Sequence, residues 1–263
     1  MSELADYYRL RDKDLLSGSV AIVEGHTLVR RMLGMGLVPR SLLCVSGQEE
    51  SYAPLLPSGC PIYSMDHEEI RELIGYKFHR GVIAAVDRPT IQSMTAGRAN
   101  ITANLVLNLE GIQEGSNFGA IIRSARAFGV RQIITGPRTA DPYSRKAIRA
   151  SAAWVFDCQL FRNERGRQGL TDLSEAGYRL LAAESRINGA RDLEDYRAEV
   201  PANRNLKEVL VLGHEYEGLQ DDWLAAMDAF LEIPMDGEVD SLNVAVAAGI
   251  FLHALSRRGS GGK

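Results

Sequence analysis

Apolar and polar positions along the first third of the chain predict a small α/β layer. Short apolar runs such as VAIVEG at 19–24 and GVIAAVD at 81–87 are separated by stretches with helical spacing, such as HTLVRRMLGMGL. Strands and helices that alternate in this way pack into one mixed layer. The polar segment PTIQSMTAGRAN follows without clear periodicity. We therefore expect a first domain at 1–90 and a linker at 91–103.

The second half of the chain contains longer apolar runs. LVLNL at 105–109, EVLVLG at 208–213 and AFLEIPM at 229–235 are examples, and helical stretches lie between such runs. Nearly continuous apolar runs are typical of parallel strands that are covered on both faces. Five or six repeats predict a doubly wound parallel sheet over 104–258, which binds ligands beyond the carboxyl ends of its strands. The tail at 259–263 is expected to be disordered.

The stretch IPMDGEVDSLNVAVAAGIFLHAL at 233–255 predicts a final helix with almost no polar face. Ser241 stands where the N-cap of this helix is expected, and small residues such as Ala245 and Gly249 mix with larger apolar ones. A helix that is apolar all round is normally buried on every side. We therefore expect this helix in the centre of the domain, although periodicity alone does not distinguish it from an ordinary core helix.

Composition excludes several classes of protein. Hydrophobic residues make up 45% and charged residues 24% of the chain, as in ordinary globular proteins. The chain has no apolar run that could span a bilayer and no signal-peptide core, so we expect a cytoplasmic protein without a membrane partner. Cys44, Cys60 and Cys158 lack CxxC spacing, and the five histidines lack metal-ligand spacing. Neither a disulfide framework nor a metal site is therefore predicted.

The charge of the chain is unevenly distributed. The net charge of −4 argues against a broadly basic nucleic-acid binder. Residues 110–170, however, carry 10 Lys and Arg against 5 Asp and Glu, whereas residues 171–263 carry 9 against 17. The middle of the chain is therefore locally basic, as a phosphate-contacting surface requires. A solvated basic face without a partner would have the same composition.

Three polar turns follow apolar runs of the second half. NFGAIIR begins at Asn117 and carries Arg123, GHEYEGL begins at Gly213 and carries Glu215, and IPMDGEVDSLN begins at Ile233. Taken singly, each is equally well explained by helix caps, surface charges and solvated carboxylates. The first could bind an anion at a helix start, but the chain has no GxGxxG dinucleotide fingerprint. Together, we expect the three turns to meet at the carboxyl edge of one sheet.

These stretches resemble the three sequence motifs of the SpoU family of RNA 2′-O-ribose methyltransferases. The family order is N-x-G-x-x-x-R, G-x-E-x-x-G and I-P-M-x-G-x-x-x-S-L-N-V, and this chain keeps every signature position. The resemblance covers 104–255, and the first third is more loosely similar to the family's small α/β RNA substrate-binding domain. It implies a C-terminal knotted (trefoil) parallel-sheet methyltransferase domain, S-adenosylmethionine as cofactor, RNA as partner, and a homodimer through the knotted domain.

The resemblance also implies roles for individual residues. The cofactor-binding residues would be Gly213, Ile233, Met235, Ser241 and Leu242. The catalytic polar set would be Asn117, Arg123, Glu215, Ser241 and Asn243. From the charge pattern, and not from the resemblance, we expect the basic segment to contact RNA phosphates through Arg138, Arg145, Lys146 and Arg149, with Arg165 and Arg167 nearby. Arg145, Lys146 and Arg149 share a helix face at three- and four-residue spacing.

Arg123 is the expected centre of the chemistry. A guanidinium is a poor base because its pKa exceeds about 12. We therefore expect Arg123 to bind the phosphate beside the target ribose and to stabilise charge that develops on the 2′-oxygen, while the proton passes to phosphate or water. Glu215 and Asn117 would hold Arg123 in place through hydrogen bonds.

The expected activity is methyl transfer from S-adenosylmethionine to a ribose 2′-hydroxyl, with ribosomal RNA favoured because a front-end domain is typical of the ribosomal enzymes of this build. Alternatives are a transfer-RNA 2′-O-methyltransferase and an inactive RNA-binding assembly factor of the same fold. An unrelated doubly wound nucleotide enzyme is a further alternative. Transfer of labelled methyl groups to RNA separates the inactive factor from the enzymes, and binding of NAD or ATP would indicate the unrelated enzyme.

Overall fold

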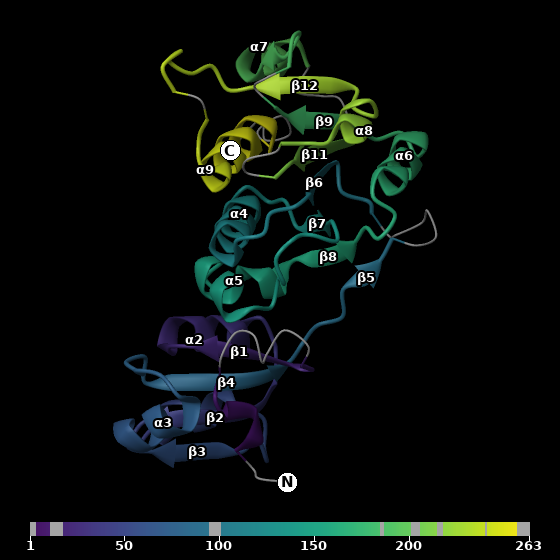
Figure 1. Cartoon of the computed structure of the whole chain (residues 1–263). Coiled ribbons are helices and arrows are strands. Elements are labelled where there is room, and N and C mark those ends of the chain that lie inside the picture. Colours follow the sequence, from purple (N-terminus) through teal and green to yellow (C-terminus); the bar gives the residue numbers. More distant parts are fainter. Residues whose placement is uncertain are drawn as a thin grey trace. The chain divides into compact units, whose positions relative to one another are not determined.

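The computed structural model describes residues 4–10, 18–94, 101–184, 187–200, 206–214, 218–239 and 241–256. The chain divides into two compact units (Figure 1), a small unit of Met1–Thr90 with Asp141–Phe156 and a large unit of Ile91–Ala140 with Asp157–Lys263. The predicted tail at 259–263 lies outside the described residues. Among the described helices, none has the length and apolar character needed to cross a membrane.

The small unit contains a four-stranded sheet in the order β1-β4-β2-β3. Strand β4 is antiparallel to β1 and β2, whereas β2 and β3 are parallel. The strands are β1 (Val20–Glu24), β2 (Pro39–Val45), β3 (Ile62–Met65) and β4 (Val82–Asp87). The helices of the first ninety residues are η1 (Ala5–Tyr7), α2 (His26–Gly34), η2 (Glu49–Ser51), η3 (Ala53–Leu55) and α3 (His67–Ile74).

The start of α3 illustrates how local sequence determines these elements. The Asp66 side chain accepts hydrogen bonds from the backbone N–H groups of Glu68 and Glu69, and the Glu69 side chain accepts one from the Asp66 N–H. This capping box satisfies N–H groups that have no partner within the helix. Ile70 and Ile74, four residues apart, then pack into the apolar core of the unit.

A segment from the second half of the chain completes the small unit. It contains α5 (Arg145–Ala150) and most of η4 (Trp154–Asp157), and α5 packs against β1. The sequence analysis placed this segment in the C-terminal domain at 104–258, so the observed division of the chain differs from the expected one here. Ion pairs explain the placement: Arg145 pairs with Glu24 at 2.6 Å, and Arg88 pairs with Asp141. Both pairs are largely buried, and breaking a buried pair leaves an uncompensated charge.

The turn after α5 contains strained backbone. Ala152 and Ala153 have φ angles of 51° and 65°, in the left-handed region that disfavours a Cβ atom. The carbonyl of Ala152 accepts a hydrogen bond of 2.6 Å from the Arg31 guanidinium, which helps to hold this conformation. Strain of this kind persists only where the surrounding structure enforces it.

We expect Ala152→Gly to stabilise the protein by about 1 kcal/mol, because glycine adopts this φ angle without steric cost. Urea unfolding measures the change. Ala150→Gly in the right-handed backbone of α5 is the matched control and is expected to lower stability. Equal losses in the two variants would show that the φ angle at Ala152 is not strained.

The large unit is built on an eight-stranded sheet in which every described pairing is parallel. The strand order is β10-β12-β9-β11-β6-β7-β8-β5. The strands are β5 (Gln92–Ser93), β6 (Leu105–Leu109), β7 (Gln132–Thr135), β8 (Gln159–Arg162), β9 (Arg179–Ala183), β10 (Arg191–Asp192), β11 (Glu208–Leu212) and β12 (Ala229–Glu232). The predicted α/β fold with a parallel sheet is confirmed. Strand β5 lies in the predicted linker, so part of that linker belongs to the sheet.

The strand order places a switch point between β6 and β11. From β6 the chain continues outward to β7 and β8, and it then returns to form β9, β11 and β12 on the other side. Leu109 and Leu212, the last residues of β6 and β11, are direct neighbours in register. The turns that carry the first and second motifs therefore begin side by side, where doubly wound sheets bind ligands.

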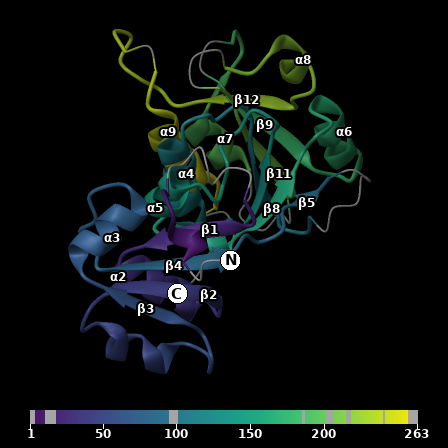
Figure 2. The same cartoon turned by 60° about the horizontal axis from the view of Figure 1, so that its bottom comes forward.

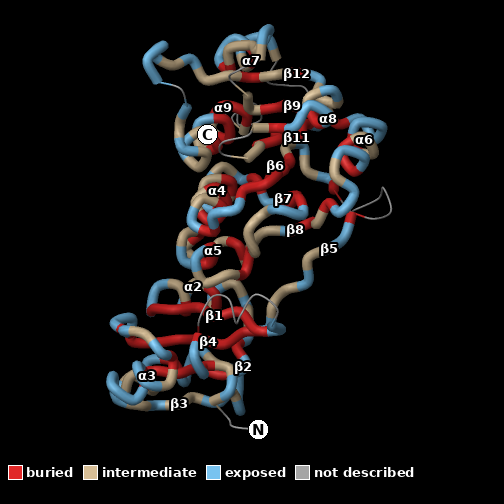
Figure 3. Tube along the Cα trace, viewed as in Figure 1, coloured by how far each residue is buried: buried red, intermediate tan, exposed pale blue. Residues whose placement is uncertain are grey.

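Five described helices accompany this sheet: α4 (Gly115–Ala127), α6 (Arg167–Glu175), α7 (Leu193–Glu199), α8 (Asp221–Leu224) and α9 (Val244–Ser256). Helices α4 and α9 pack against each other, as Figures 1 and 2 show from two directions. In Figure 3 the strands at the centre of the sheet are coloured as buried, and β11 is buried along its whole length.

Two predictions about α9 are wrong. The helix begins at Val244, and Asn243 caps it, because its Oδ1 accepts a hydrogen bond of 2.9 Å from Ala245 N; Ser241 lies outside the helix. The helix is also not buried on every side, since Val246 is 53% and Ile250 38% exposed. The opposite side packs against α4, and no described segment of this chain covers the exposed apolar residues.

Candidate functional site

A cavity of about 450 Å³ lies in the large unit, at the carboxyl ends of β9, β11 and β12 and beside the start of α9. Its lining includes all five residues that the sequence selected for cofactor binding: Gly213, Ile233, Met235, Ser241 and Leu242. Leu219, Leu231 and Phe251 add apolar wall. A concave, largely apolar site with a few polar groups is typical of small-molecule binding. The second and third motifs therefore meet at one cavity.

The turn after β11 shapes one wall of this cavity. Residues His214 and Gly218 form an antiparallel bridge with backbone hydrogen bonds of 3.2 and 3.0 Å. A Cβ atom at Gly213 would lie 2.7 Å from the carbonyl carbon of Gly218 and 2.8 Å from the nitrogen of Leu219. Only glycine allows the chain to fold back so closely. Glu215, a predicted catalytic residue, lies outside the described residues.

The first and third motifs meet through a side-chain contact. The Asn243 Nδ2 group donates to Asn117 Oδ1 at 3.2 Å, across 126 positions of sequence. Because Asn243 Oδ1 also caps α9, one amide fixes the start of α9 against the start of α4. Ser241, also exposed, precedes this contact by two residues. Three of the predicted catalytic residues therefore lie close together.

Arg123 lies further along α4, with an exposed side chain. Within the part of the chain that the structure describes, its guanidinium has no hydrogen-bond or ion-pair partner. An exposed guanidinium on the same helix as Asn117 is suited to bind a phosphate group. Its catalytic role stays a prediction.

The predicted RNA-contact residues fall in different units. Arg138 is exposed after β7 in the large unit, whereas Lys146 and Arg149 are exposed on α5 in the small unit. Arg145 differs from these, because its side chain is only 14% exposed and its guanidinium is bound to Glu24. The Cζ atom of Arg145 also lies over the ring of Tyr76, 4.3 Å from the ring centroid, which adds to this packing. Arg145 therefore mainly holds α5 in the small unit.

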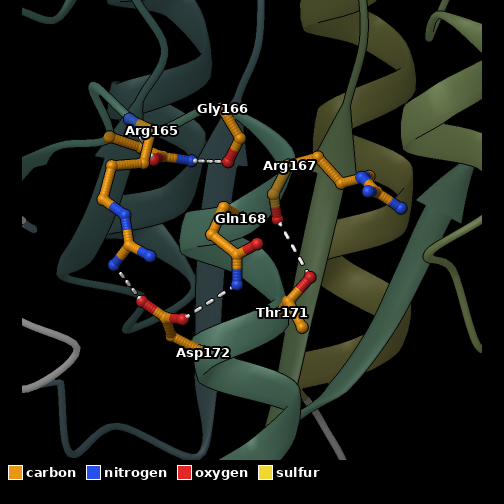
Figure 4. Close-up of polar contacts among 7 residues, drawn as sticks. Arg165, Gly166, Arg167, Gln168, Thr171 and Asp172 are labelled. Atoms are coloured by element: carbon orange, nitrogen blue, oxygen red, sulfur yellow. Dashed lines mark hydrogen bonds and ion pairs between the residues drawn. The ribbon is translucent and has the colours of Figure 1, made fainter.

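Another basic turn follows β8, and Figure 4 shows its contacts. Arg165 and Gln168 both bind the carboxylate of Asp172, and Thr171 donates its hydroxyl hydrogen to the Arg167 carbonyl. The Arg167 side chain points away from this cluster in Figure 4. Arg165 is therefore held within the turn, whereas the Arg167 side chain is directed elsewhere.

Glu110, directly after β6, is a buried carboxyl that the sequence did not select. It is 8% exposed, and its Oε2 atom has no hydrogen-bond partner among the described residues. A Cβ atom at position 136 would lie 1.7 Å from this oxygen, so only Gly136 leaves room for it. Burial raises the pKa of the Glu110 carboxyl, Arg138 opposes the shift, and Asp222 adds to it. The folded protein therefore holds a proton on this carboxyl more strongly than the unfolded chain does.

We expect Glu110→Gln to stabilise the protein at pH 8 by roughly 1 kcal/mol, the low end of the cost of a buried unsatisfied group. A raised pKa contributes stability below the unfolded carboxyl value of about 4.3, and this contribution is lost as pH rises through the folded value. The advantage of the variant should therefore grow from pH 4.5 to pH 8 in urea unfolding. Glu175→Gln, at an exposed position of α6, is the matched control. A constant difference for Glu110→Gln would contradict the assignment.

Two carboxylates of the cavity were also missed by sequence reasoning. Glu184 follows β9 and Glu232 ends β12, and both line the cavity. Neither residue stands beside a glycine or in a motif, so no motif pointed to it. The feature of the sequence that could have identified both is their place directly at the end of an apolar run. Among the described residues, no group of three or more His, Cys, Asp or Glu is arranged to hold a metal ion.

An all-parallel sheet with a cavity at its carboxyl edge, beside the switch point, defines a ligand-binding α/β protein. The particular family follows from comparison with known proteins. The model of the SpoU rRNA Methylase family matches residues 104–253, which is more than half of the chain. The chain belongs to this family, and the resemblance carried by its three motifs is confirmed.

Individual relatives agree with this assignment. An uncharacterized tRNA/rRNA methyltransferase of Mycobacterium tuberculosis is 32% identical, over 95% of this chain and 85% of its own. The structure of an AdoMet-bound rRNA methyltransferase from Sinorhizobium meliloti is 25% identical with a TM-score of 0.80, and covers 97% and 94% of the two chains. A SpoU methyltransferase from Streptomyces viridochromogenes, 24% identical over 98% and 97% of the chains, shares the fold with a TM-score of 0.77.

Proposed function

We propose that this protein transfers a methyl group from S-adenosylmethionine to a ribose 2′-hydroxyl of RNA. The observation that carries this proposal is the cavity beside the switch point, which is lined by five motif residues, among them Ser241 and Leu242, the residues just before Asn243, whose side chain contacts Asn117. Family membership supports the reaction class. The AdoMet-bound relative from Sinorhizobium meliloti supports the choice of methyl donor.

The residues of the cavity fit this cofactor. A volume of about 450 Å³ lies in the range of small-molecule sites, and apolar side chains can enclose an adenine ring. Gly213, Ile233, Met235, Ser241 and Leu242 would hold it. When bound, S-adenosylmethionine supplies an electrophilic methyl group attached to a sulfonium.

The protein's own residues would act on the ribose. Arg123 binds the neighbouring phosphate and stabilises negative charge that develops on the 2′-oxygen, since a guanidinium cannot accept the proton. The proton passes to phosphate or water. Asn117 and Glu215 are proposed to become partners of Arg123 when RNA is bound, and Ser241 and Asn243 would shape the floor of the acceptor site.

Ribosomal RNA is the proposed substrate, because the relative from Sinorhizobium meliloti is described as an rRNA methyltransferase and covers nearly all of this chain. The small unit would contribute to RNA binding through Lys146 and Arg149, and the large unit through Arg138 and Arg167. Such contacts bind phosphates and weaken with salt. The cytoplasmic location expected from the sequence belongs to the same proposal.

A homodimer through the last helix is part of the proposal. Val246 and Ile250 are exposed on one face of α9, and an exposed apolar face of this kind is typical of a protein interface. A second copy would cover it. The knotted path of the C-terminal segment, which the family resemblance implies, belongs to the same proposal.

The test is transfer of radiolabelled methyl groups to total RNA, followed by mapping of the phosphodiester bonds that resist alkaline hydrolysis. Alkali cleaves RNA because the 2′-hydroxyl attacks the adjacent phosphodiester. A 2′-O-methyl group removes this hydroxyl, so we expect the bond beside the labelled nucleotide to resist cleavage. Labelling of a base instead would refute ribose methylation. RNA binding without labelling would indicate an assembly factor, and labelling confined to transfer RNA would correct the substrate.

A further inference from the structure

Glu184 lies at the point where β9 enters the cavity wall. Its backbone N–H donates to the Leu231 carbonyl at 3.0 Å, which fixes the residue between β9 and β12. Its carboxylate reaches the turn after β11, since a Cβ atom at Gly218 would lie 2.7 Å from Glu184 Oε2. The side chain therefore crosses from β9 toward the second motif.

The charge of the cavity is negative on this side. Among the described residues that line it, Glu184 and Glu232 are carboxylates and none is Lys or Arg. Glu184 has no ion-pair or hydrogen-bond partner for its side chain within the described part of the chain. Opposite charges attract more strongly in a partly enclosed site than in water, because the effective dielectric constant is lower. A cationic ligand is therefore favoured over a neutral one of the same shape.

We propose that Glu184 selects the positively charged methyl donor over its neutral product. This inference rests on the proposed function. Methyl transfer breaks a carbon–sulfur bond, and the electron pair stays on sulfur, so the sulfonium charge is lost while the rest of the molecule is unchanged. A carboxylate that attracts this charge discriminates donor from product and favours exchange of the spent product for a new donor.

The strand order assigns this task to Glu184 in preference to Glu232. Strand β9 stands next to β11, and β11 stands next to β6, whose turn leads into the first motif. Glu184 leans toward this side, where the methyl group must be delivered to its acceptor. Glu232 ends β12, on the far side of β9, and its register neighbour is Asp192 of β10. Glu232 therefore lies on a strand further from β6 than Glu184 does.

Isothermal titration calorimetry on the full chain, without RNA, tests this inference. Wild-type protein and Glu184→Gln are titrated with S-adenosylmethionine and with S-adenosylhomocysteine. We expect the variant to bind the donor about fivefold more weakly and the product unchanged within about twofold, as for a half-exposed charge pair. Glu184→Asp, which keeps the charge, should retain most of the preference. Glu175→Gln, at the exposed position on α6, should not alter the ratio.

The outcomes separate this inference from the proposed function. Equal weakening for donor and product would overturn it, because Glu184 would then bind a part that both share. Unchanged affinities for both would overturn it as well. If the wild-type protein bound neither molecule, the proposed function would fail, and the inference would fail with it. Thermal melting of each variant without ligand verifies that the fold is retained.

Discussion

Arg123→Ala is expected to reduce methyl transfer to RNA by at least about a hundredfold, while the dissociation constant for S-adenosylmethionine changes by less than about twofold. Removing one group that stabilises developing charge typically costs this much in rate. Cofactor binding should persist because Arg123 does not line the cavity and is exposed on α4. The separation of the two effects distinguishes a residue that acts on RNA from one that supports the fold.

Single-turnover labelling of RNA measures the rate for Arg123→Ala, and calorimetry measures the affinity for the cofactor. Arg131→Ala is the matched control, because Arg131 is exposed in the same unit but precedes β7, at the opposite edge of the sheet. It should retain near wild-type activity. If Arg123→Ala retained more than about a tenth of the wild-type rate, a loss below ~1.4 kcal/mol, the assigned role would be wrong.

Gly213→Ala is expected to weaken cofactor binding by at least about thirtyfold. The added Cβ would lie within 2.9 Å of three backbone atoms of Gly218 and Leu219. Backbone atoms cannot rotate away as a side chain can, so the turn after β11 must open. An overpacked site of this kind costs about 1–3 kcal/mol, and here the displaced turn is itself a wall of the cavity.

Gly237→Ala provides the comparison for Gly213→Ala. Gly237 is also a motif glycine, but no atom lies within 4 Å of the position that its Cβ would occupy, and its φ angle is not in the left-handed region. The Gly237→Ala variant should bind the cofactor with a dissociation constant within about threefold of the wild-type value. Calorimetry and thermal melting of both variants are the measurements. Similar losses at both positions would mean that motif membership, and not close backbone packing, governs the effect.

Much of the lining of the cavity was predictable from the sequence. Gly213, Ile233, Met235, Ser241 and Leu242 all line one cavity because their motifs follow parallel strands, and parallel strands end at the same edge of a sheet. The roles of these residues remain proposals. The pattern of apolar runs also predicted the strands themselves, since burial on both faces favours apolar residues at most positions of a central strand.

Other features were not predictable because they depend on partners distant in sequence. Ser241 was a reasonable N-cap of α9 by residue type, but Asn243 is the residue that caps the helix. The same Asn243 amide also contacts Asn117, a partner that the local sequence does not reveal. Arg145 was expected to contact RNA from its spacing on a basic helix. Its burial against Glu24 depends on the packing of α5 onto the small unit.

The sequence by itself determined which segments form strands and helices and which turns carry polar groups, because apolar periodicity and capping are local properties of the chain. Only the tertiary structure decided that β6 and β11 are neighbours, that 141–156 joins the small unit, and that one face of α9 is left exposed. Glu184 became visible in the same way, through its contact with Gly218. Such contacts join residues far apart along the chain, and local periodicity contains no information about which of them pair.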